Sequence, residues 1–343
     1  MLCAGLGTRL RPLTSQLPKP LLPVLGRPLV AHSLERLATV GCEAVALNLH
    51  HLGRRIEEAV GAEWSGIPVT YSWEDVLLGT LGALRPLRSF FAPADLILIL
   101  NGDSLCRWPL ERLVKRHLRR RPGATLLVAA RAERGRFGGG IGIVEKTGAI
   151  RDFRPSGAQD PEGVVRRVFA GAHVLEPRLI DELAGGFGGG SAPGCLVRDL
   201  YEPMLARDER LCAVATRARW HDLGTPARYL DGVLDTARGR GPLRLLRRSW
   251  VAASARLARG VRLSRAAIDS GARVGVGSRI EDSMVLTGAA VAEHSHLRRT
   301  IVAPGVELPR GARIEGRIVT PLAAGRVSAA DSVVGKLVYT PLG

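Results

Sequence analysis

A repeat of 17 residues runs through the C-terminal third of the chain and restricts its fold more than any other feature. Apolar residues there are separated by intervals of six, six and five positions. They fall at Val251, Leu257, Leu263, Ile268, Val274, Ile280, Val285, Val291, Leu297, Val302, Leu308 and Ile314. Helices have a period near 3.6 residues and strands a period of 2, so neither gives this spacing. A coil with three short sides, each carrying one inward side chain, does give it.

Glycines keep the same register, which supports a repeating turn. They recur at Gly271, Gly288 and Gly305, and separately at Gly260, Gly277 and Gly311. The pattern resembles the left-handed parallel β-helix built from hexapeptide repeats, and about four coils fit into residues 251–319. Such coils are a scaffold and often an oligomerisation surface. We therefore expect a homo-oligomer formed through this region.

Histidines in the repeat region raise the question of a second chemistry. Acyltransferases with this β-helix use a histidine, so His294 and His296 are candidates. However, four coils are few, and His294 occupies a turn position that glycine fills in other coils. The repeat region is therefore interpreted as a scaffold.

Charge and composition limit the classes of partner. The chain has 343 residues and a net charge of +17, carried almost wholly by arginine. Such charge indicates anionic partners. The arginine runs at 116–121 and 238–248 lack interleaved aromatic residues, which argues against stacking on single-stranded nucleic acid. We expect no nucleic-acid partner and, because no long apolar run occurs, no membrane partner.

Five scattered cysteines indicate a reduced, cytoplasmic protein.

The first 235 residues alternate predicted strands and helices. Helices are expected over 28–40, 52–60, 109–121, 196–206 and 226–237, and strands over 44–49, 69–71, 96–100, 125–130 and 214–218. This alternation predicts a Rossmann-like, doubly wound α/β domain. A central strand should precede the first loop, yet only residues 1–4 are available for it. We expect either an upstream start or a shortened first strand.

A loop from Gly5 to Pro23 carries the residues best suited to phosphate. Its glycines let backbone N–H groups approach an anion closely. Arg9 can bind phosphate oxygens with two N–H groups, and Lys19 is a point charge held between two prolines. The spacing is not a Walker loop, since no Gly-Lys-Ser/Thr follows, and it lacks the third glycine of a dinucleotide fingerprint.

The complete string resembles a family signature. Gly-x-Gly-Thr-Arg-Leu-x-Pro-Leu-Thr, followed by Pro-Lys-Pro-Leu-x-Pro-Val, is similar to that of the sugar-1-phosphate nucleotidyltransferases, or NDP-sugar pyrophosphorylases. The resemblance implies catalytic roles for Arg9 and Lys19. It also implies a nucleotide-binding loop, and a second nucleotide segment in Leu-Gly-Thr-Leu-Gly-Ala-Leu at 78–84. The nucleotide-binding residues implied are Ala4, Gly5, Gly7, Thr8, Arg9, Gly79 and Thr80.

Two acidic residues are implied as metal ligands. Asp103 follows the apolar run 96–100, and ligands bind beyond the carboxyl ends of strands in open α/β sheets. The family carries the same Gly-Asp, and its aspartate binds Mg²⁺. Asp222 lies in Trp-x-Asp-x-Gly-Thr-Pro, the second strong signature, whose aspartate is the other Mg²⁺ ligand. Both aspartates are therefore also counted as catalytic.

Three residues are implied in binding the sugar phosphate. Gly142 and Gly171 match positions where the family's backbone faces the sugar. Arg154 stands in Phe-Arg-Pro, where the family usually has Glu-Lys-Pro and its lysine binds the phosphate. Arginine still binds phosphate but is not interchangeable with lysine. Nearby His173 is interpreted as a core or edge residue.

The resemblance implies a catalytic domain over residues 1–235, a basic linker over 236–250, the β-helix over 251–319 and a tail over 320–343. The implied reaction joins an NTP and a sugar 1-phosphate into an NDP-sugar and pyrophosphate, with Mg²⁺. Domain order and residues 78–84 favour the mannose guanylyltransferase type. Thymidylyl or uridylyl transfer to glucose, N-acetylglucosamine or N-acetylmuramic acid 1-phosphate stays an alternative. A non-catalytic regulatory paralogue that binds nucleotide sugar is another.

Overall fold

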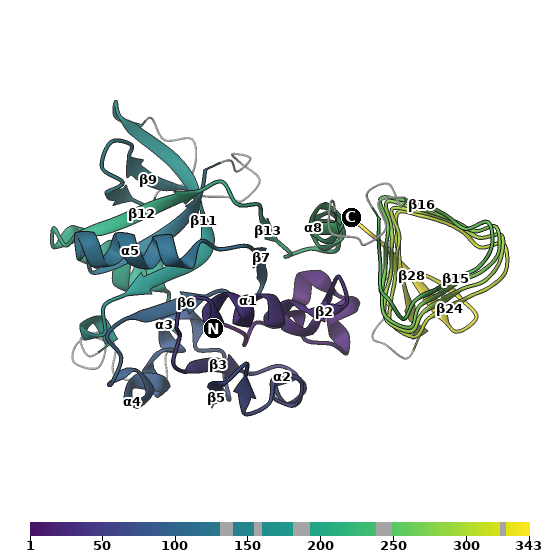
Figure 1. The fold of residues 1–343 in the computed structure, drawn as a ribbon, viewed down its shortest axis with the longest axis horizontal. Helices are drawn as coiled ribbons and strands as arrows, with labels where there is room; N and C mark the ends of the chain where they lie inside the picture. The colour runs from purple at the N-terminus through teal and green to yellow at the C-terminus, as the bar shows by residue number, and fades with distance from the viewer. Residues whose placement is uncertain (131–139, 154–159, 181–192, 238–248, 323–326) are drawn as a thin grey trace. The chain divides into compact units, whose positions relative to one another are not determined.

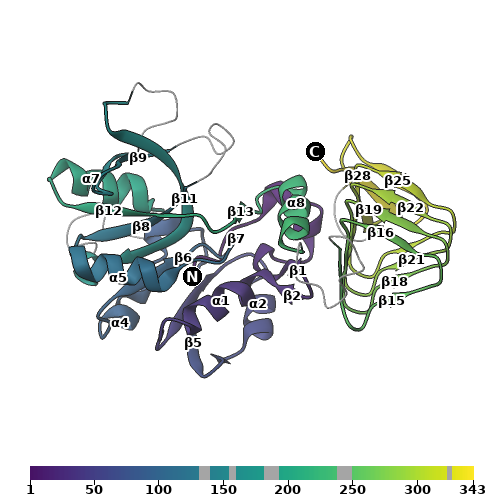
Figure 2. The same ribbon diagram turned by 45° about the horizontal axis from the view of Figure 1, so that its top comes forward.

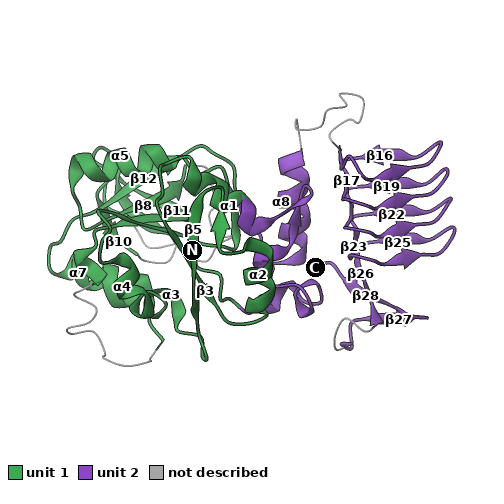
Figure 3. Ribbon diagram, turned by 60° about the horizontal axis from the view of Figure 1, so that its bottom comes forward, with its two compact units in different colours: residues 1–5, 32–220 green, residues 6–31, 221–343 purple. Residues whose placement is uncertain are grey.

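A mixed β-sheet organises most of the first 220 residues. The computed structural model describes residues 1–130, 140–153, 160–180, 193–237, 249–322 and 327–343. The chain divides into two compact units, each with most of its contacts inside itself. Unit 1 contains residues 1–5 and 32–220, and unit 2 contains residues 6–31 and 221–343. Figure 3 colours the two units. No helix in the described ranges is long and apolar enough to cross a membrane.

Unit 1 contains these strands and helices. Its strands are β3 (Val45–Leu49), β4 (Glu63–Trp64), β5 (Ile67–Trp73), β6 (Ile97–Leu100), β7 (Ser104–Cys106), β8 (Ala124–Ala129), β9 (Ile141–Val144), β10 (Ile150–Asp152), β11 (Val164–Leu175) and β12 (Leu211–Thr216). Its helices are α2 (Gly53–Val60), α3 (Gly79–Gly82), α4 (Arg88–Phe91), α5 (Leu110–Arg120) and α7 (Glu202–Ala206), while α1 (Leu29–Ala38) begins in unit 2.

The strand pairing in unit 1 agrees with the predicted α/β class. Strand β3 pairs in parallel with β5, and Leu2 forms single parallel bridges to Asn48 and Asn101. Strand β11 pairs antiparallel with both β6 and β8, and β8 pairs in parallel with β12. Figure 1 shows α5 lying across this sheet. The predicted α/β fold is confirmed, and the long antiparallel β11 is a feature that the sequence did not indicate.

The core of unit 1 explains why these segments form strands. The run Ile97–Leu100 is buried at three of its four positions, as expected for a strand covered on both faces. Helix α5 buries Leu110, Leu113 and His117 and turns its cations outward. Strand β12 covers 211–216, three residues before the predicted start, because its register follows β8 rather than the apolar pattern alone.

Unit 2 begins with the predicted phosphate loop and ends with the repeats. The loop contains 3₁₀ turns at Thr8–Leu10, Leu13–Ser15 and Lys19–Leu21, then the short strands β1 (Pro23–Val24) and β2 (Arg27–Pro28). Strand β13 (Trp220–Asp222) leads into helix α8 (Pro226–Ala237). The predicted linker at 236–250 lies mostly outside the described residues, which resume at 249.

The repeats form the predicted three-sided β-helix. Its strands are β14 (Trp250–Val251), β15 (Arg256–Leu257), β16 (Arg262–Ser264), β17 (Ala267–Ile268), β18 (Arg273–Val274), β19 (Arg279–Glu281), β20 (Met284–Val285), β21 (Ala290–Val291), β22 (His296–Arg298), β23 (Ile301–Val302), β24 (Glu307–Leu308), β25 (Arg313–Glu315) and β26 (Arg317–Pro321). They stack in parallel with a register of 17, as in Ile268 opposite Val285. Figures 1 and 2 show the coil along its axis and from the side.

The spacing of apolar residues is confirmed as the inward set from Ile268 onward, whereas in the first coil Leu257 is 37% exposed and Val251 and Leu263 are half-buried. Ile268, Ile280, Val285, Leu297 and Val302 are fully buried. The turn glycines have positive φ angles, and His294 takes φ 56° at the equivalent turn position. The tail is also ordered where it is described: β27 (Ser332–Val334) and β28 (Leu337–Pro341) form a hairpin, and β28 pairs antiparallel with β26.

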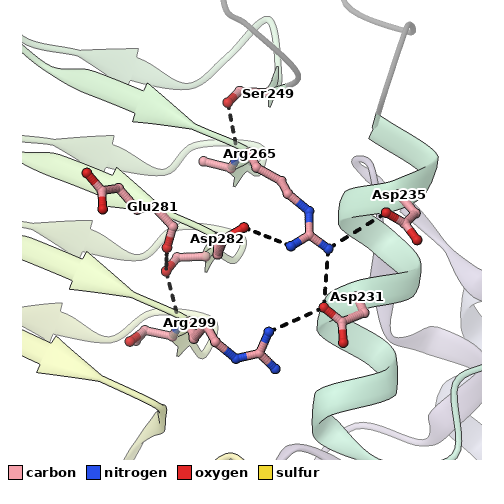
Figure 4. A network of polar contacts seen from close by, with 10 residues as sticks. Asp231, Asp235, Ser249, Arg265, Glu281, Asp282 and Arg299 are labelled. Carbon is pink, nitrogen blue, oxygen red and sulfur yellow. Dashed lines mark hydrogen bonds and ion pairs between the residues drawn. The ribbon is translucent and has the colours of Figure 1, made fainter.

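Within unit 2, helix α8 is joined to the β-helix by a network of ion pairs (Figure 4). The Arg265 guanidinium lies 2.8 Å from Asp282 Oδ1, 3.3 Å from Asp231 Oδ1 and 3.7 Å from Asp235 Oδ1. Arg299 also reaches Asp231, at 3.5 Å. Arg265 therefore compensates three carboxylates from a helix and a coil at once.

We expect Arg265→Met to lower the free energy of unfolding by about 1–3 kcal/mol, because it removes the cation that three partly buried carboxylates share, of which Asp231 keeps Arg299 at 3.5 Å. Urea unfolding of the full chain measures this change. Arg273→Met is the matched control, since Arg273 is 55% exposed and has one partner at 3.4 Å. Equal effects in both variants would contradict a special role for Arg265.

Candidate functional site

The predicted phosphate loop is held in a tight bend in unit 2. Gly7 has φ 61°, and the Thr14 hydroxyl donates a hydrogen bond of 2.7 Å to the Gly7 carbonyl. A Cβ at Gly7 would lie only 3.1 Å from the Thr14 methyl carbon, so little space is left for a side chain. Thr8 and Arg9 follow in the first 3₁₀ turn, and Lys19 opens the third, where it is only 7% exposed.

Asp222 and Arg9 come together at Gly224. A Cβ built on Gly224 would lie 2.8 Å from Asp222 Oδ1 and 3.1 Å from Arg9 Nη2, so both groups border the same point. Arg228, in the first turn of α8, donates to Asp222 Oδ2 at 2.7 Å. Two arginines from distant parts of the sequence therefore face one of the predicted metal ligands.

Arg228 was missed at the sequence level. It lies six positions after Asp222, and Thr225 caps the helix between them by accepting the Arg228 backbone N–H at 3.3 Å. The cap turns the first helical residues back toward the strand end. A basic residue in the first turn after Gly-Thr-Pro was the available signal.

Asp103 lies in unit 1, in the turn after β6, next to Gly171. The Asn101 N–H donates to the Gly171 carbonyl at 2.9 Å, and Ser104 Oγ donates to Asp103 Oδ1 at 3.2 Å. Gly171 has φ 78°, and a Cβ there would meet Ser104 Oγ at 3.1 Å. The structure thus brings the predicted metal ligand Asp103 and the predicted sugar residue Gly171 onto adjoining backbone.

A buried carboxylate connects the two predicted nucleotide segments of unit 1. Asn48 Oδ1 accepts the Cys3 N–H at 2.7 Å, directly before Ala4 and Gly5. Asn48 Nδ2 donates to Glu74 Oε1 at 2.7 Å, and Glu74 Oε2 accepts the Leu78 N–H at 2.9 Å. Asn48 and Glu74 are each 5% exposed. Sequence reasoning missed both, although a polar residue at the end of an apolar strand was a usable signal.

The segment Gly79–Gly82 is fixed by a second backbone contact. Gly79 has φ 71°, and a Cβ there would lie 2.5 Å from the Gly194 carbonyl oxygen. That carbonyl accepts the Leu81 N–H at 2.9 Å, and Gly194 N–H donates to the Leu78 carbonyl at 2.8 Å. The Thr80 hydroxyl accepts the Leu196 N–H at 2.9 Å, so this side chain positions the segment.

Gly142 lies opposite an ion-pair cluster. A Cβ at Gly142 would lie 2.8 Å from Asp152 Oδ1. Asp152 pairs with Arg166 at 2.6 Å, and Arg166 also contacts Asp160 at 2.6 Å. Arg154, the third predicted sugar-phosphate residue, lies outside the described residues.

His173 is a core residue, as the sequence indicated. Its Nδ1 lies 2.7 Å from the Tyr201 hydroxyl, and its ring contacts Phe169 edge-on with centroids 4.4 Å apart. Burial lowers the pKa of His173 to about 3, so the ring is neutral in the folded chain.

We expect this histidine to make the chain less stable in acid. Unfolding raises its pKa from about 3 toward the ordinary value near 6.5. The stability that depends on the neutral ring is therefore fully present above pH 6.5 and is lost as pH falls toward 3. The free energy of unfolding should drop by about 2 kcal/mol between pH 7 and pH 5 from this residue. Urea unfolding at both pH values should give a smaller loss for His173→Gln than for the wild type. The exposed control His294→Gln should keep the wild-type loss, and an unchanged loss in His173→Gln would contradict this assignment.

The two aspartates suit a hard divalent cation. Within the described residues, no three His, Cys, Asp or Glu side chains gather into a metal cluster. Mg²⁺ is commonly held by one or two carboxylates together with substrate phosphates, so the carboxylate of Asp103 and that of Asp222 are each ligands of the kind that Mg²⁺ prefers. The Arg228 contact also keeps one oxygen of Asp222 oriented.

Comparison with known proteins gives the same division of the chain. The model of the nucleotidyl transferase family matches residues 1–239, and that of the GlmU-like C-terminal hexapeptide family matches residues 241–319. The mannose-1-phosphate guanylyltransferase catalytic subunit beta of Drosophila melanogaster is 28% identical over 68% of this chain and 61% of its own length. The mannose-1-phosphate guanyltransferase of Pichia angusta is 30% identical over 68% of this chain and 62% of its own. The chain thus spans about three fifths of the length of these curated relatives.

Solved structures show the same fold. HddC from Yersinia pseudotuberculosis, crystallised in complex with GMP-PN, is 20% identical, with a TM-score of 0.56. The similarity covers 68% of this chain and 97% of that one. With the family model matching more than half of the residues, the chain belongs to the nucleotidyl transferase family and carries a C-terminal hexapeptide-repeat β-helix.

Proposed function

We propose that the chain transfers a nucleotidyl group from an NTP to a sugar 1-phosphate, releasing pyrophosphate and an NDP-sugar of the GDP-mannose type. The observation that carries this proposal is the meeting of Arg9 and Asp222, from the two signature motifs, at Gly224. Membership of the nucleotidyl transferase family and relatives named as mannose-1-phosphate guanylyltransferases support it.

The reaction needs positioning and charge neutralisation. A phosphate oxygen of the sugar 1-phosphate attacks the α-phosphorus of the NTP in line, the bond to the bridging oxygen breaks, and pyrophosphate leaves. Arg9 and Lys19 neutralise charge on the α-phosphate and on the departing pyrophosphate. Family members generally use a divalent metal ion. We propose Mg²⁺ held by Asp103 and Asp222, which would supply further charge neutralisation between the two phosphates.

The remaining predicted residues are proposed to bind the substrates. Backbone N–H groups of Gly5, Gly7 and the Gly79 segment suit the nucleotide, because glycine permits close approach. Gly142 and Gly171 are proposed to face the sugar, and Arg154 to bind its phosphate. Ala4, Thr8 and Thr80 complete the proposed nucleotide set, with Thr80 acting through its backbone, since its hydroxyl already accepts the Leu196 N–H.

A substrate panel tests the proposal. GTP, dTTP, UTP, CTP and ATP are each paired with mannose, glucose, N-acetylglucosamine and N-acetylmuramic acid 1-phosphates, and pyrophosphate release is measured with and without Mg²⁺. We expect GTP with mannose 1-phosphate to give the highest Mg²⁺-dependent rate. A higher rate with a different pair of NTP and sugar 1-phosphate would support nucleotidyl transfer but contradict GTP and mannose 1-phosphate as the substrates. Nucleotide-sugar binding without any release would favour the regulatory alternative.

Assembly and organisation are proposed from the same pattern. We propose a cytoplasmic homo-oligomer formed through the β-helix, with a catalytic domain at 1–235, a linker at 236–250, the β-helix at 251–319 and the tail at 320–343. The matches of two separate family models near residue 240 support this division. Light scattering of the full chain measures the number of subunits.

A further inference from the structure

A cavity in unit 1 is surrounded by positive charge. It lies beside α5 and the turn between β9 and β10, and its volume is about 600 Å³. None of the residues proposed above for catalysis or substrate binding lines it. The cationic residues that do are Arg112, Lys115, Arg116, Arg119, Lys146 and Arg167. Two acidic residues, Glu111 and Glu145, also contribute, which leaves a formal charge of +4.

The cations converge from separate parts of the chain. Four of them lie on α5 at positions i, i+3, i+4 and i+7, which is one face of the helix. Lys146 comes from the turn after β9, and Arg167 from β11. Within the described residues, Arg112, Lys115, Arg119 and Lys146 form no ion pair. Like charges at these helical spacings repel, so the arrangement destabilises the empty helix face and suits an anionic ligand.

The cavity wall is fixed in place. Arg116 Nη2 donates to the Thr147 carbonyl at 2.6 Å, which ties α5 to the β9–β10 turn. The Gly148 carbonyl accepts the Ala213 N–H at 2.7 Å, which ties that turn to β12. Gly148 has φ 76°, and a Cβ there would lie 2.9 Å from the Ala213 carbonyl oxygen. These contacts join α5, the β9–β10 turn and β12 around the cavity.

The floor of the cavity is apolar. Val128 and Ile143 are buried in the sheet, and Val165 is half-buried beside them. Cavities of 300–1,000 Å³ with an apolar surface and a few charged groups are typical sites for small organic ligands. Apolar side chains, which suit a base or sugar, and cations, which suit phosphate, therefore line the same cavity.

We propose that this cavity binds a nucleotide-sized organic phosphate, at a site separate from the one proposed for the transfer reaction. The arginine-rich helix could instead serve a nucleic acid. The volume of about 600 Å³, the apolar residues of the lining and the contributions of β9–β10 and β11 favour a small molecule. The inference does not depend on the proposed reaction, because it stands on the cavity alone.

The test is GTP binding by equilibrium dialysis at 150 mM salt. The full-length chain carries Arg9→Gln and Lys19→Gln, which removes the two cations proposed to neutralise the phosphates of the NTP at the transfer site. In this background, Arg112→Gln with Lys115→Gln should weaken GTP binding at least tenfold. Arg120→Gln with Arg210→Gln is the matched control, because it removes the same charge from exposed residues outside the cavity; it should change affinity less than twofold.

Three results would overturn the proposal. The first is an absence of GTP binding in the background variant at millimolar concentration. The second is an equal loss of GTP affinity in the cavity pair and in the control pair, because GTP binding would then depend only on the net charge of the chain. The third is binding of a random 20-base-pair DNA duplex that the cavity pair of substitutions weakens and that GTP does not compete with. Pyrophosphate release by the unmodified chain is measured separately, so a failure of the transfer proposal is distinguishable from a failure of this one.

Discussion

Asp222→Asn is expected to lower the rate of nucleotidyl transfer by at least about 10²–10³-fold, because preorganised charges at a reacting phosphate have effects of that size. The amide keeps the shape of the carboxylate but loses its negative charge. It would therefore hold a divalent cation poorly while still accepting the Arg228 hydrogen bond, which is 2.7 Å long in the native chain. The measurement is the initial rate of pyrophosphate release at saturating NTP, sugar 1-phosphate and Mg²⁺.

The matched control for this substitution is Asp208→Asn. Asp208 is exposed, in a turn with φ 58°, a conformation that asparagine adopts readily. The rate of pyrophosphate release by the Asp208→Asn variant should stay within twofold of the wild type. Urea unfolding of both variants should give similar free energies, since Asp222 is not a core residue. A rate for Asp222→Asn within tenfold of the wild type would remove Asp222 from the proposed metal site.

Gly79→Ala is expected to have the largest effect of any single methyl group in the proposed nucleotide segments. Its Cβ would lie 2.5 Å from the Gly194 carbonyl oxygen, a backbone atom that cannot rotate away. The residue also needs φ 71°, which costs alanine about 1 kcal/mol. With the steric overlap, we expect a loss of about 2–5 kcal/mol in the free energy of unfolding. Because the displaced segment contains the backbone N–H groups proposed to bind the nucleotide, the KM for the NTP should rise as well.

The control isolates the steric term. Gly41 has φ 69° and no atom within 4 Å of its built Cβ, so Gly41→Ala carries the backbone cost without the overlap. Urea unfolding should give a loss near 1 kcal/mol for Gly41→Ala and a clearly greater loss for Gly79→Ala. Equal losses would contradict the close packing of Gly79 against Gly194.

The features that sequence reasoning predicted are those with a local signal. The β-helix followed from one inward side chain per short strand, and Ile280 and Val285 are buried as that spacing requires. Helix α5 was predicted over 109–121, and in the structure it buries Leu110 and Leu113. The roles of Arg9 and Lys19 stay predictions, and they also come from a local signal, because the residues of the signature loop are consecutive in the sequence.

The features that it missed depend on contacts between distant residues. Glu74 acts through Asn48, which is 26 positions earlier, and no periodicity connects the two. The antiparallel direction of β11 is decided by its pairing with β6 and β8, whose residues lie far apart in the chain. The hairpin of β27 and β28 has no 17-residue spacing, because it pairs antiparallel with the last coil instead of adding a new one.

The most direct test of the proposed function uses one substrate pair and identifies both products. The full chain is incubated with GTP and mannose 1-phosphate, and GDP-mannose and pyrophosphate are quantified by anion-exchange chromatography, with and without EDTA. We expect the two products in a one-to-one ratio, formation abolished by EDTA, and recovery on addition of excess Mg²⁺. Hydrolysis of GTP to GDP and phosphate, or no turnover of any NTP in the substrate panel, would contradict nucleotidyl transfer as the activity of this chain.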